Sequence, residues 1–310
     1  MLAERIVAID LGGTSLKGAV VSEATPEVAI RPTPAAEGPD AVVDAVAGFA
    51  AELVGGAQAV AGIGLAVPGI VDEDSGTVIE AANLGWRDVA IGPVVQERVG
   101  VPVSLRHDVR AAALAEGTVG AARGYNDYLL LTLGTGVGAA VVFGGKPYTG
   151  LGGRGGELGH TTVDPGGPLC ACGGHGCLEA YASAGALVGR YRERTGERVE
   201  AEEVVARAAG GDRVAQVLWD DVLDALALTI ANYATLLAPE LVVIGGGLAG
   251  AGDYLFGPLV RRLESLVRFA VAPAVVPAAL GPDAGWRGAA IAASQAAGVS
   301  GLAVTSSATP

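Results

Sequence analysis

Three ionisable side chains follow one another closely in SLRHDVRAAALAE, which spans residues 104–116. His107, Asp108 and Arg110 stand where a β-type run at 101–105 gives way to an Ala-rich segment that predicts a helix. Asp108 has two interpretations: it caps the helix, or its carboxylate is a general base. Arg110 is expected to form a structural ion pair with Glu116 or another carboxylate.

All three cysteines of the chain fall in CACGGHGC (170–177), and GELGH (156–160) precedes them. An odd, clustered set is a poor disulfide framework but a good metal set. Zn²⁺ takes four thiolate or imidazole ligands at tetrahedral angles. Cys170, Cys172 and Cys177 would supply three, and the fourth is His160 or His175, since spacing does not decide. Four protein ligands would make the zinc structural; the alternative is three free thiols.

Two glycine-rich turns, in DLGGTSLK and TLGTGVG, each join two β-type runs. The first is neither a Walker A loop nor a dinucleotide fingerprint, because the Gly-Lys-Ser/Thr ending is absent and a strand follows. Its backbone N–H groups would approach phosphate oxygens closely, and Asp10 would hold Mg²⁺ through water. The alternative is an ordinary hairpin. Together with the glycines ending LVVIGGG, the predicted nucleotide-binding residues are Asp10, Gly12, Gly13, Thr14, Lys17, Gly134, Thr135, Gly136, Gly245, Gly246 and Gly247.

Strands and helices alternate around these motifs. Asp40 is the expected N-cap of the first helix. The mixture predicts the α/β class, and the similarity of the two glycine turns with their flanking runs suggests two related lobes. Strands are predicted at 5–10, 61–71, 101–105 and 241–247, and helices at 40–55, 88–99, 253–268 and 285–298, with a helical region at about 179–238.

The net charge of −13 argues against a nucleic-acid partner, which would need a basic face. Residues 128–145 are uncharged and long enough to span a membrane, but five glycines interrupt them, so two strands and no membrane partner are predicted. The N-terminus has acidic Glu4 before a very short apolar run and no cleavage site, which excludes a signal peptide. A cytoplasmic protein is expected.

Several motifs together resemble the ROK family (repressor, open reading frame, kinase) of bacterial sugar kinases and sugar-responsive repressors. DLGGTSLKGAVV and LTLGTGVGAAVV resemble its phosphate motifs, and LVVIGGGLAG resembles its adenosine motif. HDVRAAALAEG resembles its Asn-Asp-Ala-Asn-Ala-Ala-Ala segment. GELGH with CACGGHGCLEAYAS resembles its Glu-x-Gly-His and Cys-x-Cys-Gly-x-x-Gly-Cys-x-Glu signature, and LGPDAGWRGAA resembles its C-terminal segment.

The resemblance implies an α/β, two-lobed hexokinase/actin-like (ribonuclease H-like) fold with a ligand cleft between the lobes. The N-terminal lobe would span 1–120 and be completed by a C-terminal helix at about 287–300. The second lobe, 121–286, would carry the zinc loop, the nucleotide site and the dimerisation surface. ATP, Mg²⁺, a structural Zn²⁺ and assembly as a homodimer or homotetramer are also implied.

The resemblance further implies a glucokinase-like enzyme in which Asp108 is the base for the 6-hydroxyl of a hexose. ATP is the implied phosphate donor, and polyphosphate is the alternative. Zinc would take His160 with the three cysteines, one ring nitrogen on the metal and the other facing the sugar. The sugar would be held by Gly69, Asn83, His107, Asp108, Glu157, His160 and Glu179.

His107 departs from the family pattern, in which Asn precedes the catalytic Asp. A neutral His offers one donor and one acceptor in a larger ring than the Asn amide. Three accounts stay open. His107 replaces Asn in binding glucose; or it accommodates a modified sugar, such as a 3-amino-hexose (kanosamine-like) or a cyclitol; or it faces away and packs.

Repressors of the family carry a winged helix-turn-helix before the first phosphate motif. Only MLAER precedes the first strand of this sequence, so a kinase is expected. A non-catalytic sugar sensor is the alternative from another functional class.

Overall fold

The structure is a computed structural model that describes residues 4–22, 25–56, 59–300, 302 and 304. It is a mixed α/β protein whose chain divides into two compact units. The first contains the described residues of Met1–Gly124, Pro147–Gly155 and Pro282–Pro310, and the second contains Tyr125–Lys146 and Gly156–Gly281. The domain limits drawn from the sequence stay a prediction.

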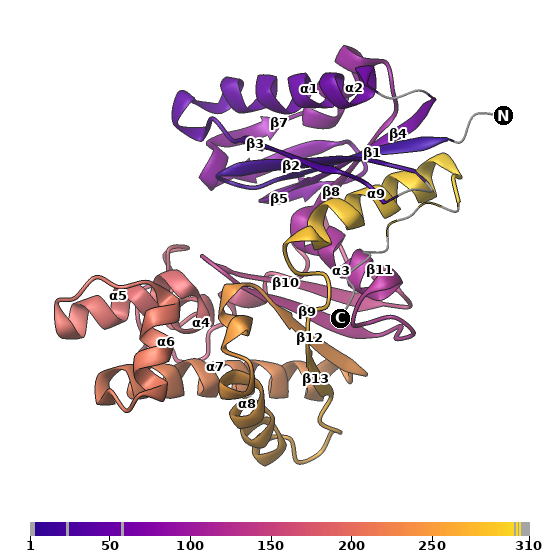
Figure 1. Ribbon diagram of the computed structural model, residues 1–310. Coiled ribbons are helices and arrows are strands. Elements are labelled where there is room, and N and C mark those ends of the chain that lie inside the picture. The colour runs from indigo at the N-terminus through magenta and orange to yellow at the C-terminus, as the bar shows by residue number, and fades with distance from the viewer. Residues whose placement is uncertain (1–3, 23–24, 57–58, 301, 303, 305–310) are drawn as a thin grey trace. The chain divides into compact units, whose positions relative to one another are not determined.

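The first unit is built on a five-stranded sheet with the order β3-β2-β1-β4-β8 (Figure 1). Strands β1 and β2 form an antiparallel hairpin, whereas β1, β4 and β8 run parallel. Most residues of β1 and β4 are buried, as expected for strands covered on both faces. The strands are β1 (Arg5–Leu11), β2 (Ser15–Val21), β3 (Val28–Pro32), β4 (Val60–Val67) and β8 (Val103–His107).

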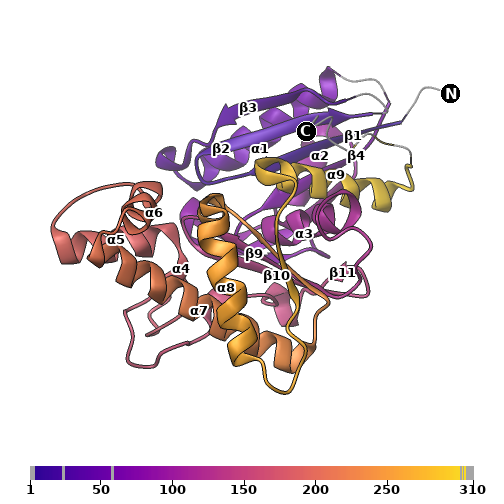
Figure 2. The same ribbon diagram turned by 60° about the horizontal axis from the view of Figure 1, so that its bottom comes forward.

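Helices cover both faces of this sheet. Figures 1 and 2 show α1 (Pro39–Gly55) and α2 (Ile91–Val99) on one face and α9 (Ala284–Ala297) on the other. Helix α3 (Asp108–Val119) packs against α9. A Cβ atom at Gly64 of β4 would lie 2.0 Å from the Ala289 carbonyl oxygen, so this close approach of α9 requires glycine.

A smaller antiparallel sheet, β5-β6-β7, belongs to the same unit. Trp86 of β7 is buried and donates its Nε1–H to the Pro39 carbonyl at 3.1 Å. All three tryptophans are buried and pack in the cores. The remaining elements of this unit are β5 (Ile70–Asp72), β6 (Thr77–Ala81), β7 (Trp86–Val89), η1 (Ala35–Glu37), η2 (Ala82–Leu84) and η3 (Leu151–Gly153).

The second unit repeats the architecture, with the sheet order β11-β10-β9-β12-β13. Strands β9 and β10 form an antiparallel hairpin, and β12 and β13 run parallel to β9. The two sheets thus share their order and strand directions, as the repeated glycine turns suggested. The strands are β9 (Tyr128–Leu133), β10 (Val137–Phe143), β11 (Lys146–Pro147), β12 (Leu241–Gly245) and β13 (Ala274–Pro277).

The long helix α7 (Arg213–Leu237) supplies much of the core of the second unit. It begins at an N-cap, Asp212, whose carboxylate accepts the Ala215 N–H at 2.9 Å. The other helices and turns of this unit are α4 (Glu179–Ala182), α5 (Ala184–Thr195), α6 (Ala201–Ala209), α8 (Asp253–Leu266), η4 (Leu158–His160) and η5 (Gly247–Ala251), and η6 (Gly281–Asp283) leads back to α9.

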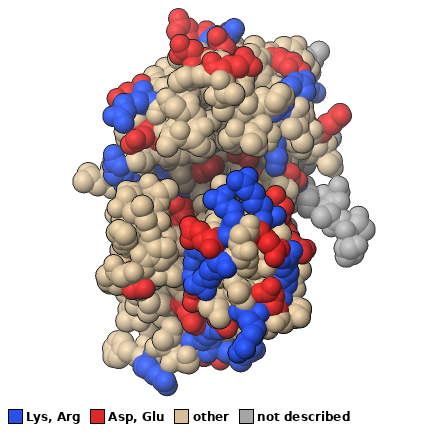
Figure 3. All heavy atoms as spheres, turned by 90° about the vertical axis from the view of Figure 1, so that its left-hand side faces the viewer, with Lys and Arg blue, Asp and Glu red and all other residues tan. Residues whose placement is uncertain are grey.

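The face that carries α5 and α6 is not uniformly acidic, despite the net charge of −13. Figure 3 shows Lys and Arg interspersed with Asp and Glu on this face. Arg207 of α6, for example, pairs with Glu197 and Glu203. Such exposed pairs contribute little stability each, about 0.2–1 kcal/mol.

Two local predictions are wrong. Gly38, not Asp40, is the N-cap of α1, because Pro39 begins the helix at the position where its missing N–H costs nothing. The helix predicted at 88–99 begins at Ile91, since residues 86–89 pair as β7.

The uncharged run 128–145 forms the hairpin strands β9 and β10, as predicted. Among the residues that the structure describes, no helix combines the length and apolar character needed to cross a membrane. The small and polar residues of 300–310 predict a C-terminal tail that frays. Residues 301, 303 and 305–310 lie outside the described residues, and the described Leu302 and Val304 pack against the core formed with α9.

Candidate active site

Two predicted carboxylates belong to the same edge of the first unit's sheet. In the β1–β4 pairing Asp10 lies opposite Ala66, and in the β4–β8 pairing Val67 lies opposite His107. The carboxyl ends of parallel strands meet at one edge, which is where α/β folds place ligands. The register therefore brings Asp10 near Asp108, the residue that follows β8.

Asp108 is the first residue of α3, and His107 occupies the N-cap position. The interpretation of Asp108 as the N-cap is therefore wrong, because Asp108 is already inside the helix and its carboxylate contacts the first turn from there. Its Oδ1 accepts the Val109 N–H at 2.7 Å and lies 3.3 Å from His107 Nε2. Both contacts are made by Oδ1, so they also fix the direction in which Oδ2 points.

Burial raises the pKa of Asp108 to about 6, while the Val109 amide and the Arg110 guanidinium act in the opposite direction. Burial and the neighbouring Asp108 carboxylate raise the pKa of Asp10 to about 7, and Lys17 lowers it. The Asp10 carboxylate offers oxygen ligands, which are the kind that Mg²⁺ prefers. Asp10 therefore fits the predicted magnesium.

The first glycine turn is a tight hairpin tip, in which the Gly12 N–H donates to the Ser15 carbonyl at 2.8 Å. Lys17 Nζ donates to the Pro282 carbonyl at 2.9 Å, which ties β2 to the segment that begins α9. A Cβ atom at Gly13 would lie 3.4 Å from Asn83 Nδ2, so the predicted sugar residue Asn83 adjoins this turn.

Gly69 has a φ of +100°, and a Cβ atom there would lie 2.2 Å from the Glu80 carbonyl oxygen. The turn between β4 and β5 therefore needs a glycine. Sequence reasoning missed a similar glycine, Gly285, where a Cβ atom would lie 2.4 Å from an Asp10 carboxylate oxygen. Only the fold reveals that the start of α9 abuts Asp10.

The second glycine turn and the Gly245–Gly247 run share an edge of the second unit's sheet. Gly245 lies opposite Thr132 in the β12–β9 pairing, and the Gly134 N–H donates to the Gly136 carbonyl at 3.0 Å. Gly246 has a φ of +86°, and a Cβ atom there would lie 2.4 Å from the Leu133 carbonyl oxygen. The predicted nucleotide residues of this unit therefore gather at one place.

His160 and the three cysteines place one ligand atom each within 4.8 Å of one another. Cys172 Sγ lies 3.7 Å from Cys177 Sγ, and Cys170 Sγ lies 3.7 Å from His160 Nδ1. Zinc held tetrahedrally at about 2.3 Å from each sulfur separates two sulfurs by about 3.8 Å, so the spacing fits. His175 instead contacts the Gly167 carbonyl through Nδ1 at 3.2 Å.

Glu179 lies between the zinc cluster and the second glycine turn. Its Oε2 accepts the Val137 N–H at 2.9 Å, and its Oε1 lies 3.8 Å from Cys170 Sγ. A Cβ atom at Gly136 would lie 2.6 Å from Glu179 Oε2, which accounts for a glycine there. The predicted sugar ligand is thus anchored to the backbone that begins β10.

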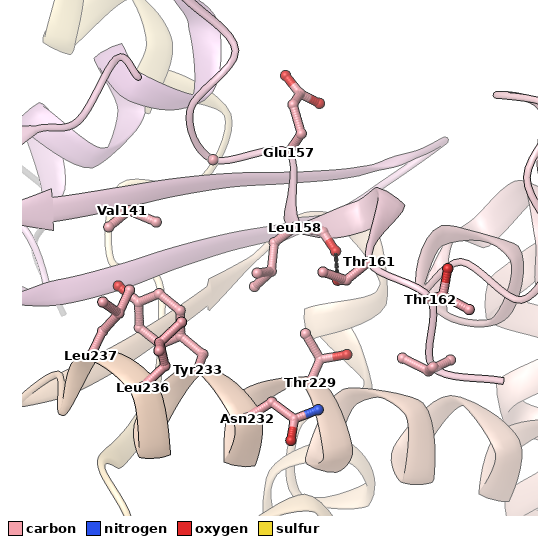
Figure 4. Close-up of a pocket in the computed structure, with 12 residues that line it drawn as sticks. Val141, Glu157, Leu158, Thr161, Thr162, Thr229, Asn232, Tyr233, Leu236 and Leu237 are labelled. Atoms are coloured by element: carbon pink, nitrogen blue, oxygen red, sulfur yellow. Dashed lines mark hydrogen bonds between the residues drawn. The ribbon is translucent and has the colours of Figure 1, made fainter. Parts of the chain in front are cut away.

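Glu157 adjoins a pocket of about 360 Å³ in the second unit. Figure 4 shows Leu158 pointing into this pocket and Glu157 pointing away from it. The lining is mainly apolar and offers few hydrogen-bonding groups for sugar hydroxyls, so we do not identify this pocket with the predicted sugar site. It is lined by Val141, Gly156, Glu157, Leu158, Thr161, Thr162, Val163, Thr229, Asn232, Tyr233, Leu236 and Leu237.

Glu73 is a residue that sequence reasoning missed. It forms ion pairs with Arg106 and Arg110, the arginines on either side of His107 and Asp108, each at 2.6 Å. Arg110 therefore pairs with Glu73, and Glu116 accepts the Ala121 N–H instead. A turn glutamate between two short strands carries no signal in the sequence that would reveal this partnership.

The model of the ROK family matches residues 6–296 of this sequence. This chain belongs to the ROK family. A glucokinase from Thermotoga maritima is 37% identical over 305 residues, which cover 92% of this chain and 96% of that relative. By this relationship over nearly its whole length, the chain is a carbohydrate kinase.

Solved structures of the family agree in fold. A ROK hexokinase from Thermus thermophilus superposes with a TM-score of 0.85 at 35% identity, covering 94% of this chain and 98% of that one. A ROK family glucokinase from Streptomyces griseus, in complex with glucose and AMPPNP, has a TM-score of 0.80 at 31% identity, covering 94% and 99%. The predicted two-lobed hexokinase/actin-like fold is thereby confirmed.

Within the ROK pattern, the HDVR segment departs at two polar positions. His107 and Arg110 stand where the Asn-Asp-Ala-Asn segment has its two asparagines. Both substituted side chains contact the surroundings of Asp108 or the elements next to it. The departures therefore concern the immediate surroundings of Asp108 and not a remote part of the fold.

Proposed function

We propose that this chain transfers the γ-phosphoryl group of ATP to the 6-hydroxyl of a hexose, glucose or a glucose-like sugar, with Asp108 as the general base. One observation carries the proposal. Asp108 lies at the carboxyl edge of parallel strands, with Oδ1 held by the Val109 N–H at 2.7 Å. Its pKa of about 6 leaves it ionised, and able to accept a proton, at neutral pH.

In this reaction the sugar O6 attacks the γ-phosphorus, and the bond from that phosphorus to the departing ADP oxygen breaks. The O6 proton passes to Asp108. Both fixed contacts are made by Oδ1, so Oδ2 is the oxygen that we assign to the hydroxyl. The remaining catalysis is positioning and stabilisation of charge on the phosphoryl group.

Each unit is assigned its own share of the ligands. In the first unit, Gly69, Asn83 and His107 would line the sugar beside Asp108, and Gly12, Gly13, Thr14 and Lys17 would bind phosphate. In the second unit, Glu157, His160 and Glu179 would bind sugar hydroxyls, and Gly134, Thr135, Gly136, Gly245, Gly246 and Gly247 would bind the nucleotide. When bound beside Asp10, Mg²⁺ would neutralise phosphate charge.

A structural zinc would be held by His160, Cys170, Cys172 and Cys177. Nδ1 is the His160 nitrogen nearest to the Cys170 sulfur, so Nε2 is the nitrogen that would face the sugar. Zinc would thus fix both the ring orientation and the tautomer of this sugar ligand.

The acceptor could instead be a modified sugar, such as a 3-amino-hexose, or a cyclitol. His107 favours this alternative because it stands where the family has an amide and its Nε2 lies 3.3 Å from Asp108 Oδ1. Its ring therefore occupies space beside the base that an Asn side chain would leave to the substrate. A protonated His107 would repel an ammonium, so the amino-sugar alternative requires the neutral ring.

The test measures ADP release with ATP and Mg²⁺ against a panel of glucose, mannose, N-acetylated and amino hexoses, and cyclitols. Wild-type protein should turn over at least one acceptor, and Asp108→Asn should lose at least about a hundredfold in kcat. Parallel assays replace ATP by polyphosphate. Asp44→Asn, which removes an exposed carboxylate of the same unit, is the matched control.

Binding without turnover across the whole panel would contradict the kinase and leave the non-catalytic sensor. A thermal-shift screen with the same acceptors detects such binding, because ligands raise the melting temperature by mass action. Light scattering tests the homodimer or homotetramer that we propose for the assembled enzyme.

A further inference from the structure

Arg110 carries a buried guanidinium two residues after Asp108. Its side chain is 2% exposed. Its Nε donates to Glu73 Oε1 at 2.6 Å, its Nη1 donates to the Gly153 carbonyl at 3.1 Å, and its Nη2 donates to the Val71 carbonyl at 3.4 Å. All three guanidinium nitrogens are thus used, and together they hold two segments of the first unit, residues 71–73 and Gly153.

Glu73 completes this arrangement from the turn between β5 and β6. It is 6% exposed, and its Oε2 accepts Arg106 Nη1 at 2.6 Å. Its Oε1 accepts the backbone N–H of His107 at 3.2 Å in addition to Arg110 Nε. One carboxylate therefore binds the residue before Asp108 through its backbone and the residue two after it through its side chain.

The segments that Arg110 ties together approach one another unusually closely. Gly153 of η3 has a φ of +74°, and a Cβ atom there would lie 2.1 Å from the Val71 carbonyl oxygen. Any side chain at 153 would push η3 away from β5 and from the guanidinium. The backbone is therefore shaped to bring two carbonyl oxygens to Arg110.

The energetics argue that this network serves something other than stability. Burying two charges costs several kcal/mol per ion in desolvation, and apolar residues of similar volume usually stabilise a fold as well or better. The network holds the backbone N–H of His107 on one side of Asp108 and the side chain of Arg110 on the other.

We propose that Arg110 and Glu73 are positioning residues that hold Asp108 in place for its reaction with the sugar hydroxyl. The proposal rests on the proposed kinase function. Proton transfer requires hydrogen-bond reach, and a displacement of about 1 Å can cost about a hundredfold in rate. Arg110 touches no reacting atom in this scheme and acts through Asp108.

The experiment compares Arg110→Gln, Arg110→Lys and Glu73→Gln in the wild-type enzyme and in the Asp108→Asn background, measuring kcat and both KM values. In the wild-type background, Arg110→Gln and Glu73→Gln should lower kcat by about 10- to 100-fold, with the KM for ATP unchanged within about twofold. In the Asp108→Asn background, the same substitutions should change kcat by less than about threefold, because there is no base left to position.

Arg110→Lys keeps the charge and one donor group, so its loss in kcat should be smaller than that of Arg110→Gln. Arg110→Lys can still be measured if the Arg110→Gln variant does not fold. Arg98→Gln, which breaks an exposed ion pair with Asp44 in the same unit, is the control and should leave kcat within about twofold.

Losses that multiply with the loss caused by Asp108→Asn would overturn the inference and leave the proposed function intact. A rise in KM with kcat unchanged would also overturn it. Absence of turnover in the wild-type enzyme would instead contradict the proposed function, on which this inference rests.

Discussion

At the residue scale, Asp108 has the fixed geometry and the raised pKa that suit the general base that we propose. Oδ1 is occupied by the Val109 N–H and the His107 ring, which orients the carboxylate. Burial raises its pKa to about 6, and the Val109 amide and Arg110 limit the rise. The same carboxyl group is therefore ionised at neutral pH and more basic than an exposed aspartate.

This protonation equilibrium predicts an acid limb in the pH profile of kcat/KM for the sugar. The base works only when ionised, so activity should fall about tenfold per pH unit below about 6 and level off above it. Initial rates from pH 4.5 to 8.5 check this. The residual activity of Asp108→Asn should not fall in this way at low pH. If that variant showed a fall with the same midpoint, a group other than Asp108 would be responsible for it.

At the element scale, the loop from 160 to 177 has no regular structure of its own to hold its shape. Its shape rests on isolated bridges, such as Leu169 with His175, on turn hydrogen bonds, such as that from the Val163 N–H to the Gly176 carbonyl at 2.8 Å, and on the cluster of His160 with three cysteines. A metal bound by this cluster would contribute directly to the stability of the loop, because a preformed site does not exist in the unfolded chain.

Zinc removal should therefore destabilise the second unit. Wild-type protein should contain one zinc per chain by mass spectrometry of the metal, and chelation should lower the melting temperature by at least about 5 °C. Cys172→Ser should lose the metal. His175→Ala is the matched control, since His175 contacts Gly167 and lies outside the cluster, and it should keep the metal. Loss of zinc from His175→Ala would contradict this assignment and make His175, in place of His160, the fourth zinc ligand.

The backbone directly after β12, at Gly246, has a geometry that allows only glycine. Gly246→Ala should lower the free energy of unfolding by about 2–4 kcal/mol, because the positive φ disfavours a Cβ atom that would also meet the Leu133 carbonyl at 2.4 Å. The KM for ATP should rise as the adjoining turn shifts. Gly250→Ala, with no neighbour within 4 Å and no positive φ, should leave both quantities nearly unchanged. Denaturant titration and ATP kinetics check this.

At the scale of the whole molecule, the first unit is discontinuous in sequence. Helix α9 comes from the far end of the chain and fills one face of the first sheet with Trp286, Ala289 and Ala290, all fully buried. A unit built this way cannot be completed until the chain has passed through the second unit.

Gly64→Ala tests this closure. The new Cβ atom would lie 2.0 Å from the Ala289 carbonyl oxygen, so α9 must move and unfolding should become easier by about 2–4 kcal/mol. Gly62→Ala on the same face of β4 meets only ordinary contacts, the nearest at 3.5 Å, and should cost less than about 1 kcal/mol. Equal melting temperatures for the two variants would contradict a tight β4–α9 contact.

The sequence by itself determined the local chemistry and the element types. Glycine turns between β-type runs, helical periodicity and the Cys-x-Cys spacing act over a few residues, so they can be read without the fold. Prediction from local sequence failed where two capping signals lay next to each other. Asp40 was predicted as the N-cap of α1, but Gly38 is the N-cap because Pro39 begins the helix. Asp108 and the family were accessible to sequence reasoning for the same local reason.

Only the tertiary structure decided which distant residues meet. Spacing left His160 and His175 equivalent, and the fold placed His160 with the sulfurs. Nothing local links Glu73 to Arg110, yet a parallel register and a tight turn bury them together at 2.6 Å. The physical reason is that ion pairing and ligand geometry depend on three-dimensional separation and burial, which the chain acquires only when β8, β5 and η3 come together around Asp108.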